Sequence, residues 1–222
     1  MLRRVGFRVE LDRLRDGVAL VALGAFAAML LSATLGSGTQ VLTGALPTGD
    51  FWRTWASWWA GDAMGVLVIT PLVLAFRTFR PPRDLPLYRW VEAAVLLGTV
   101  VLVSLVMTRS PMSLLFLVFP VIVWAALRFQ LIGAAPCVLV ISVFAISAAS
   151  GRYGPFHGLS LLEIMVNLQA LNASAALTAL LLSAIVTEQN TIRRGIEQVC
   201  WELAEVVDRL APGESRRWPP ER

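Results

Sequence analysis

The chain has 222 residues, of which 57% are hydrophobic and 15% are charged, and its mean hydropathy is +0.69. This composition differs strongly from that of a soluble domain and indicates a membrane protein whose main partner is the lipid bilayer. All 19 basic residues are arginine, and the net charge is +4. Because the arginines occur in short segments between apolar runs, and not in one basic domain, we expect no nucleic-acid partner.

Apolar segments long enough, or nearly so, to cross a bilayer predict an all-α polytopic membrane helix bundle of about six transmembrane helices. They cover residues 17–35, 54–76, 90–107, 112–127, 131–149 and 161–186. The fourth is short and contains Pro120. The segment 1–16 precedes the membrane domain 17–186, and the tail 187–222 follows it.

The arginines predict the orientation of these segments. The N-terminal segment, the connections after the second and fourth segments and the tail together hold 16 arginines, whereas the opposite loops hold three. Since cytoplasmic loops are enriched in basic residues, both termini are expected in the cytoplasm.

The second apolar segment begins with tryptophans and then carries a carboxylate, Asp62, at membrane depth. Tryptophan suits the headgroup boundary, because it has an apolar body and one N–H that needs a polar partner. Asp62 is expected about 12 Å below the outer end of the segment, at 1.5 Å per residue. An ionisable group at that depth costs at least a few kcal/mol, so it normally faces protein or water and marks a functional position.

The sixth segment carries amides at a similar depth, Asn167, Gln169 and Asn172. Asn167 lies on a different helix face from the other two, so the helix should contact protein or water on two faces. The simplest hypothesis is a polar cluster of Asp62 with these amides. The alternative is interhelical hydrogen bonding that only holds helices together, at about 0.6 kcal/mol per bond.

Other chemistry-bearing residues are few. Arg128, which ends the fourth segment, is most simply an interfacial anchor that reaches lipid headgroups, and Glu92 is expected to reach interfacial water. Cys137 lies in the fifth segment and Cys200 in the tail, so they are not expected to pair. With one histidine, no metal-ligand spacing and no nucleophile motif, we expect no catalytic residue, no metal and no cofactor, and hence no enzyme.

A series of motifs occurs in a fixed order along the chain. It comprises S-A-T-L-G (32–36), W-x-x-W-W-x-G-D-x-x-G-V-L-x-x-x-P-L (55–72), W-A-A-x-R-F (124–129), G-P-F (154–156) and L-Q (168–169). Together, over roughly residues 10–190, they resemble the MASE-type membrane-associated sensor domain. The resemblance implies a multi-pass sensory module of the bacterial inner (cell) membrane, a type that commonly precedes histidine kinase, diguanylate cyclase or phosphodiesterase domains.

The motifs and the amides of the sixth segment supply the candidate ligand or sensory residues. These are Trp55, Trp58, Trp59, Gly61, Asp62, Gly65, Pro71, Trp124, Arg128, Asn167, Gln169 and Asn172. Family members usually have further spans ahead of the first segment found here, so we expect a module that lacks the first spans and an output domain of its own. The leading hypothesis is a signal-transducing membrane module without catalytic activity, which acts on a histidine kinase, diguanylate cyclase or other signalling protein in trans. The alternative is a small transporter or channel component, since buried polar residues can line a pathway.

The tail carries a heptad seam, in which apolar residues recur with spacing 4-3-4-3-4. The seam comprises Ile192, Ile196, Val199, Leu203, Val206 and Leu210. The same register extends backward into the sixth segment, which predicts one continuous helix. We expect a homodimer through 192–210, and the alternatives are an amphipathic helix on the membrane or packing within the chain.

Overall fold

The computed structural model describes residues 14–78, 86–110 and 114–210, and these ranges contain helices and no strand. Five of the described helical segments are long and apolar enough to cross a membrane, which confirms the predicted all-α membrane bundle. The elements are α1 (Leu14–Ala19), η2 (Leu20–Ala27), α2 (Ala28–Leu42), η3 (Thr48–Asp50), α3 (Phe51–Thr78), α4 (Leu87–Arg109), η4 (Leu115–Leu117), α5 (Val118–Gly151), η5 (Gly154–Phe156) and α6 (Leu161–Leu210). Most of the predicted N-terminal segment 1–16 and of the connection after α3 lies outside the described residues.

The first span is longer than the sequence predicts. The elements α1, η2 and α2 follow one another without a break, with π-helical turns in the middle, and the apolar part runs over Gly17–Leu42 where 17–35 is predicted. The polar residues after Leu35 suggest that the first span ends there, but they are compatible with a continuing helix. The hydroxyl of Thr39 donates a hydrogen bond of 2.6 Å to the carbonyl of Leu35 one turn earlier, so it needs no solvent.

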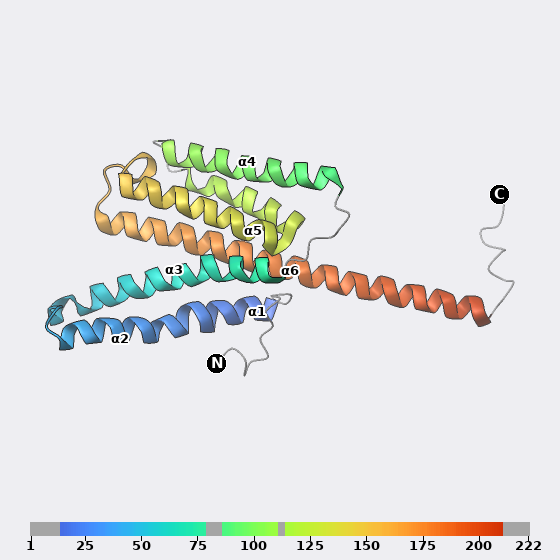
Figure 1. Cartoon of the computed structure of the whole chain (residues 1–222), viewed down its shortest axis with the longest axis horizontal. Helices are drawn as coiled ribbons and strands as arrows, with labels where there is room; N and C mark the ends of the chain where they lie inside the picture. Colours follow the sequence, from blue (N-terminus) through green and yellow to red (C-terminus); the bar gives the residue numbers. More distant parts are fainter. Residues whose placement is uncertain (1–13, 79–85, 111–113, 211–222) are drawn as a thin grey trace.

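α5 is not one straight helix, because Gln130 has non-helical backbone angles (φ 54°, ψ −148°). The chain reverses there (Figure 1). Arg128 forms an ion pair with Glu92 near the start of α4, whereas Gly154, after the end of α5, lies against the carbonyl of Thr108 near the end of α4. The two arms of α5, 118–129 and 131–151, therefore run in opposite directions along α4.

These two arms correspond to the fourth and fifth predicted segments, and the predicted break between 127 and 131 includes Gln130. A small residue makes the reversal possible. A Cβ on Gly133 would overlap the Cβ of Phe129, so the second arm can start this close to the first only with glycine. At 1.5 Å per residue the first arm spans only about 18 Å, whereas the second spans about 31 Å.

α6 begins with a capping box at Ser160 and Glu163. The carboxylate of Glu163 accepts hydrogen bonds from the backbone N–H and the hydroxyl of Ser160, at 2.8 and 2.7 Å, and the Glu163 N–H donates to the Ser160 hydroxyl at 3.4 Å. The helix then continues for 50 residues, about 75 Å, and its second half projects beyond the bundle (Figure 1). The prediction of one continuous helix from the sixth span into the tail is confirmed as far as Leu210.

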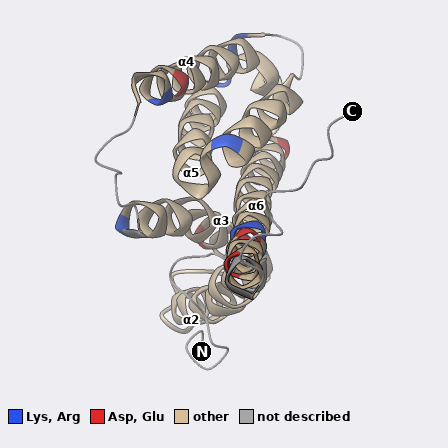
Figure 2. Ribbon diagram, turned by 90° about the vertical axis from the view of Figure 1, so that its right-hand side faces the viewer, with Lys and Arg blue, Asp and Glu red and all other residues tan. Residues whose placement is uncertain are grey.

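The core of the bundle consists mostly of small side chains. Ala63 of α3, Ala125 and Ala134 of α5 and Ala175 of α6 are completely buried. Alanine lets membrane helices approach closely and gain van der Waals contact, which drives their association where no water is present. In an end-on view, α4 and α5 lie on one side and α2 on the other, and charged residues are sparse along the bundle (Figure 2).

Candidate functional site

The tryptophan-rich half of α3 packs against α2 and η2. Trp55 donates a hydrogen bond of 3.0 Å from Nε1 to the hydroxyl of Thr34, and Trp59 donates one of 3.2 Å to the carbonyl of Phe26. The rings of Trp55 and Trp59 stack with centroids 6.0 Å apart, and Phe26 lies 5.6 Å from Trp59. Both indole N–H groups thus have protein partners, as their position at membrane depth requires.

Asp62 and Trp58 lie one helical turn apart on α3 and contact two small residues on α2. The hydroxyl of Ser32 donates a hydrogen bond of 3.3 Å to the carboxylate of Asp62. Trp58 covers Gly36 so closely that a Cβ there would lie 2.6 Å from Cζ3 of the indole. With the Thr34–Trp55 bond, three residues of the motif at 32–36 each contact a different residue of the motif at 55–72.

The predicted cluster of Asp62 with the amides of α6 is not what the structure has. The only hydrogen-bond partner found for the carboxylate within the described chain is Ser32, and Asp62 is exposed on the surface of the bundle. Asn167 is exposed as well, on another helix. The prediction was wrong because α2 and α3 form a tight helical pair, so the nearest donor to Asp62 is on α2.

Gln169 and Asn172 lie one turn apart on α6 and face inward. Asn172 is only 6% exposed, and the side-chain oxygens of both amides are buried without a hydrogen-bond partner in the described part of the chain. A buried carbonyl oxygen without a donor is costly, and each such group in a native structure calls for an explanation, such as a bound ligand or water. These two residues are therefore the strongest surviving candidates of the predicted set.

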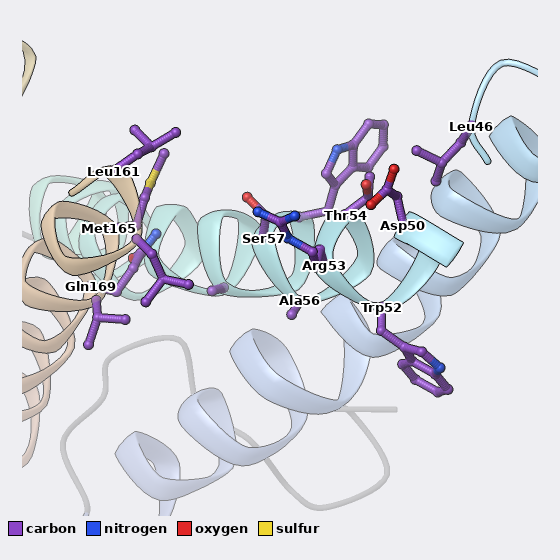
Figure 3. Close-up of a pocket in the computed structure, with 14 residues that line it drawn as sticks. Leu46, Asp50, Trp52, Arg53, Thr54, Ala56, Ser57, Leu161, Met165 and Gln169 are labelled. Carbon is purple, nitrogen blue, oxygen red and sulfur yellow. The ribbon is translucent and has the colours of Figure 1, made fainter. Parts of the chain in front are cut away.

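A groove of about 1010 Å³ lies between the first half of α3 and the first turns of α6 (Figure 3). Gln169 lines it, together with Met165 and Val166 of the same helix. The wall from α3 includes Trp58 and, toward the start of the helix, Arg53. The groove thus combines Arg53, Asp50 and indoles near the start of α3 with an apolar interior and Gln169, whose buried amide oxygen has no partner in the described part of the chain.

Part of this groove was not predicted from the sequence. Arg53 was counted only among the arginines of the outer loops, and Asp50 was not singled out. The sequence did carry a signal, since both α3 and α6 were predicted to begin on the same side of the membrane. The packing of the two helices decides which of their faces meet, and this packing cannot be predicted from a pattern in one sequence.

The remaining candidate residues either pack within the bundle or lie exposed on its surface. Arg128 donates a hydrogen bond from Nε to the carboxylate of Glu92, so the residue expected to be a free anchor has a protein partner. Trp124 packs partly buried against the main core, and Pro71 is buried inside α3. Gly61 and Gly65 are exposed, with no atom within 4 Å of the position of a Cβ.

The G-P-F motif closes the connection between the end of α5 and the start of α6. Gly154 has a positive φ of 61°, and any Cβ there would overlap the carbonyl of Thr108, so only glycine fits. Phe156 is completely buried in a small cluster with Ala148, Ala149 and Ile164. This motif fixes the loop between two spans and carries no reactive group.

Within the described residues, no group of three or more His, Cys, Asp or Glu side chains is placed to hold a metal ion. The two cysteines, Cys137 and Cys200, are free, the first buried and the second exposed.

Comparison with known proteins gives one finding. The model of the MASE1 family matches residues 1–190. No curated protein and no solved structure matches the chain.

Proposed function

The chain belongs to the MASE1 family, and we propose on that premise that it is a membrane sensory module that reads its stimulus in the groove between α3 and α6. The family match agrees with the resemblance found in the motifs, and the family is one of membrane sensory domains. The alternative of a small transporter or channel component is not favoured by this match. The arginine distribution supports an orientation in which the groove faces the outside and both termini face the cytoplasm.

The main support for this proposal is that a wall of the groove and the exposed heptad seam belong to the same helix, α6, which is unbroken over 50 residues. A ligand that spreads or closes the groove would shift the first turns of α6 and, since a helix transmits translation and rotation along its axis, also the seam. Gln169 supports this proposal, because it lines the groove and its side-chain oxygen is buried without a donor in the described part of the chain.

The seam would be the output element. Its described side chains Ile192, Ile196, Val199, Leu203 and Val206 are each between 49 and 60% exposed, although all are apolar. They do not pack on the bundle, so the structure differs from the alternative of packing within the chain. Such a row at heptad spacing is typical of a parallel two-stranded coiled coil.

On this proposal the module has no catalytic activity, and it forms a homodimer through 192–210. The seam would pass its state to a histidine kinase, a diguanylate cyclase or another signalling protein in trans. The membrane domain 17–186 would sense, and the tail 187–222 would transmit.

The proposal is tested by filling the groove and measuring the seam. Val166→Trp places an indole in the groove, and Val143→Trp is a matched control, because Val143 is a similarly exposed valine on the membrane surface of α5 (54% against 58%). Each is combined with Ile196→Cys in a Cys200→Ser background, and the rate of disulfide formation between protomers is measured in membranes. We expect Val166→Trp to change the rate by about fivefold or more, at the lower end of typical coupling between sites, and Val143→Trp to leave it unchanged. Equal rates in all three proteins would contradict a sensory role for the groove.

A further inference from the structure

A second cavity, which the proposed function does not use, lies at the arginine-rich end of the bundle. It has a volume of about 500 Å³ and is enclosed by the start of α4 and the reversal of α5. Its position is fixed by the Glu92–Arg128 ion pair, which joins the same two elements. It is far from the groove, because α3 and α6 begin at the opposite end of the bundle (Figure 1).

The mouth of this cavity is basic. Arg89 of α4 and Arg128 of the first α5 arm both line it, and among the described residues no acidic side chain does. Glu92 takes the Nε donor of Arg128, and the Arg128 side chain is still 43% exposed. A guanidinium has five N–H donors, so both arginines keep donors for a further anion.

The rest of the cavity is apolar. Its walls include Ala93 and Leu97 of α4 and Ile132 and Pro136 of the second α5 arm. Trp90 stands at the rim and is 61% exposed. Gln130, the residue with the reversed backbone, also lines the cavity and adds an amide to the mouth. The arginines and the indole at the mouth are complementary to the phosphate headgroup of a phospholipid, and the apolar interior is complementary to its acyl chain.

We propose that this cavity binds one anionic phospholipid of the cytoplasmic leaflet, with its phosphate between Arg89 and Arg128 and the upper part of an acyl chain between α4 and the second arm of α5. Basic pockets between membrane helices on the cytoplasmic side are suited to anionic headgroups, and each basic residue near the surface contributes about 1 kcal/mol. A bidentate contact from guanidinium to phosphate adds geometric specificity to this attraction. The lipid would bridge α4 and the point at which α5 reverses.

The reversal of α5 gives this lipid a structural role. The second arm, which starts at the reversal, spans about 31 Å, close to the hydrocarbon thickness of about 30 Å, so Gln130 lies at the level of the headgroups. A lipid held at the mouth would cover the polar backbone of the reversal. This inference does not depend on the sensory proposal, since it concerns the other end of the bundle.

The test uses the purified full-length protein in mild detergent and counts retained lipids by native mass spectrometry. Phosphatidylglycerol and phosphatidylcholine with identical acyl chains are added in separate titrations. Arg89→Gln removes one cation from the mouth, and Arg109→Gln is its matched control, because Arg109 is an exposed arginine at the opposite end of the same helix. Ala93→Trp fills the apolar interior without changing any charge.

We expect the wild type to retain one phosphatidylglycerol in preference to phosphatidylcholine. Arg89→Gln should weaken that binding by about fivefold, as the loss of one basic contact predicts, while Arg109→Gln should not. Ala93→Trp should abolish it. Binding that is the same for both lipids in the wild type, or that falls equally in both arginine variants, would overturn the proposal. Wild-type affinity in Ala93→Trp would place the lipid elsewhere and would overturn it as well, even if Arg89→Gln did not fold.

Discussion

The hydroxyl of Ser32 on α2 donates a hydrogen bond of 3.3 Å to the carboxylate of Asp62 on α3. This contact joins two sequence motifs that lie 30 residues apart, and it lies one turn from the packing of Trp58 on Gly36. Residues of these two motifs therefore contact one another and hold the first two spans together. The two amide oxygens that are buried without a donor in the described chain, of Gln169 and Asn172, are elsewhere, on α6.

Gly36 and Gly38 allow a test of the α2–α3 contact by identical substitutions two residues apart. Gly36→Ala should destabilise the protein by about 1–3 kcal/mol, because the new Cβ would overlap the indole of Trp58. Gly38→Ala has no atom within 4 Å of its Cβ and should be neutral, or stabilising by about 1 kcal/mol at most. Reversible unfolding in mixed micelles measures both, and equal effects would exclude the close contact. The double variant Gly36→Ala/Trp58→Ala should lose much of the effect of the first substitution.

Asp62 is exposed, so its replacement should cost little stability. Asp62→Leu removes one hydrogen bond, worth about 0.6 kcal/mol, and also a charge that costs about 3 kcal/mol at membrane depth. We expect the free energy of unfolding of Asp62→Leu to equal or exceed that of the wild type. The value for Asp62→Asn should lie between those two. A loss of several kcal/mol in Asp62→Leu would instead support the buried cluster with the amides of α6 that the sequence suggested.

The extent to which the sequence predicted the fold can be judged from α5. Apolar segments on either side of residues 127–131 predicted two spans and a short connection, and the structure has two arms that meet at Gln130. Segment length and hydropathy are local properties, so they can be read from the sequence. The ion pair of Glu92 with Arg128 was not predicted, although both residues were assigned to the same side of the membrane. Their pairing depends on how α4 and the first arm pack.

The candidate site was predicted less well, for the same reason. Gln169 and Asn172 were identified because amides at membrane depth are costly, and both oxygens are indeed buried without donors in the described chain. Asp62 was assigned to the wrong neighbours, because depth along a helix is readable from sequence and the identity of the adjacent helix is not. Residues 32–36 were noted only as a motif, and their partners on α3 became visible only in three dimensions.

The reversal of α5 makes a topological prediction. In a background with Cys137 and Cys200 replaced by serine, Gln130→Cys should react with a membrane-impermeant maleimide only from the cytoplasmic side. Gly158→Cys should react only from the outside. Maleimide labelling of each cysteine is compared between intact cells and inverted membrane vesicles. Labelling of both positions from one side would contradict two separate spans in α5, because an odd number of crossings must separate them.

The seam predicts a pattern of crosslinks around α6. In a Cys200→Ser background, single cysteines at Ile196, Val199 or Leu203 should form disulfides between protomers, because a and d positions of parallel helices face each other. Gln198→Cys is the control on the outward face. Its own side chain donates a hydrogen bond of 2.9 Å to Glu202 along the helix surface. Crosslinking that is uniform at all four positions, or absent from all, would favour a monomeric tail on the membrane surface.

We propose that α6 carries a change in the groove to the seam as one rigid helix, and softening the helix between the two tests this transmission directly. Asn190→Gly/Thr191→Gly weakens the helix by about 1 kcal/mol per site relative to Asn190→Ala/Thr191→Ala, which serves as the control. Disulfide formation at Ile196→Cys is measured in each background with and without Val166→Trp. We expect Val166→Trp to change the rate in the alanine background and to have no effect in the glycine background. An equal effect in both backgrounds would contradict transmission through a rigid α6.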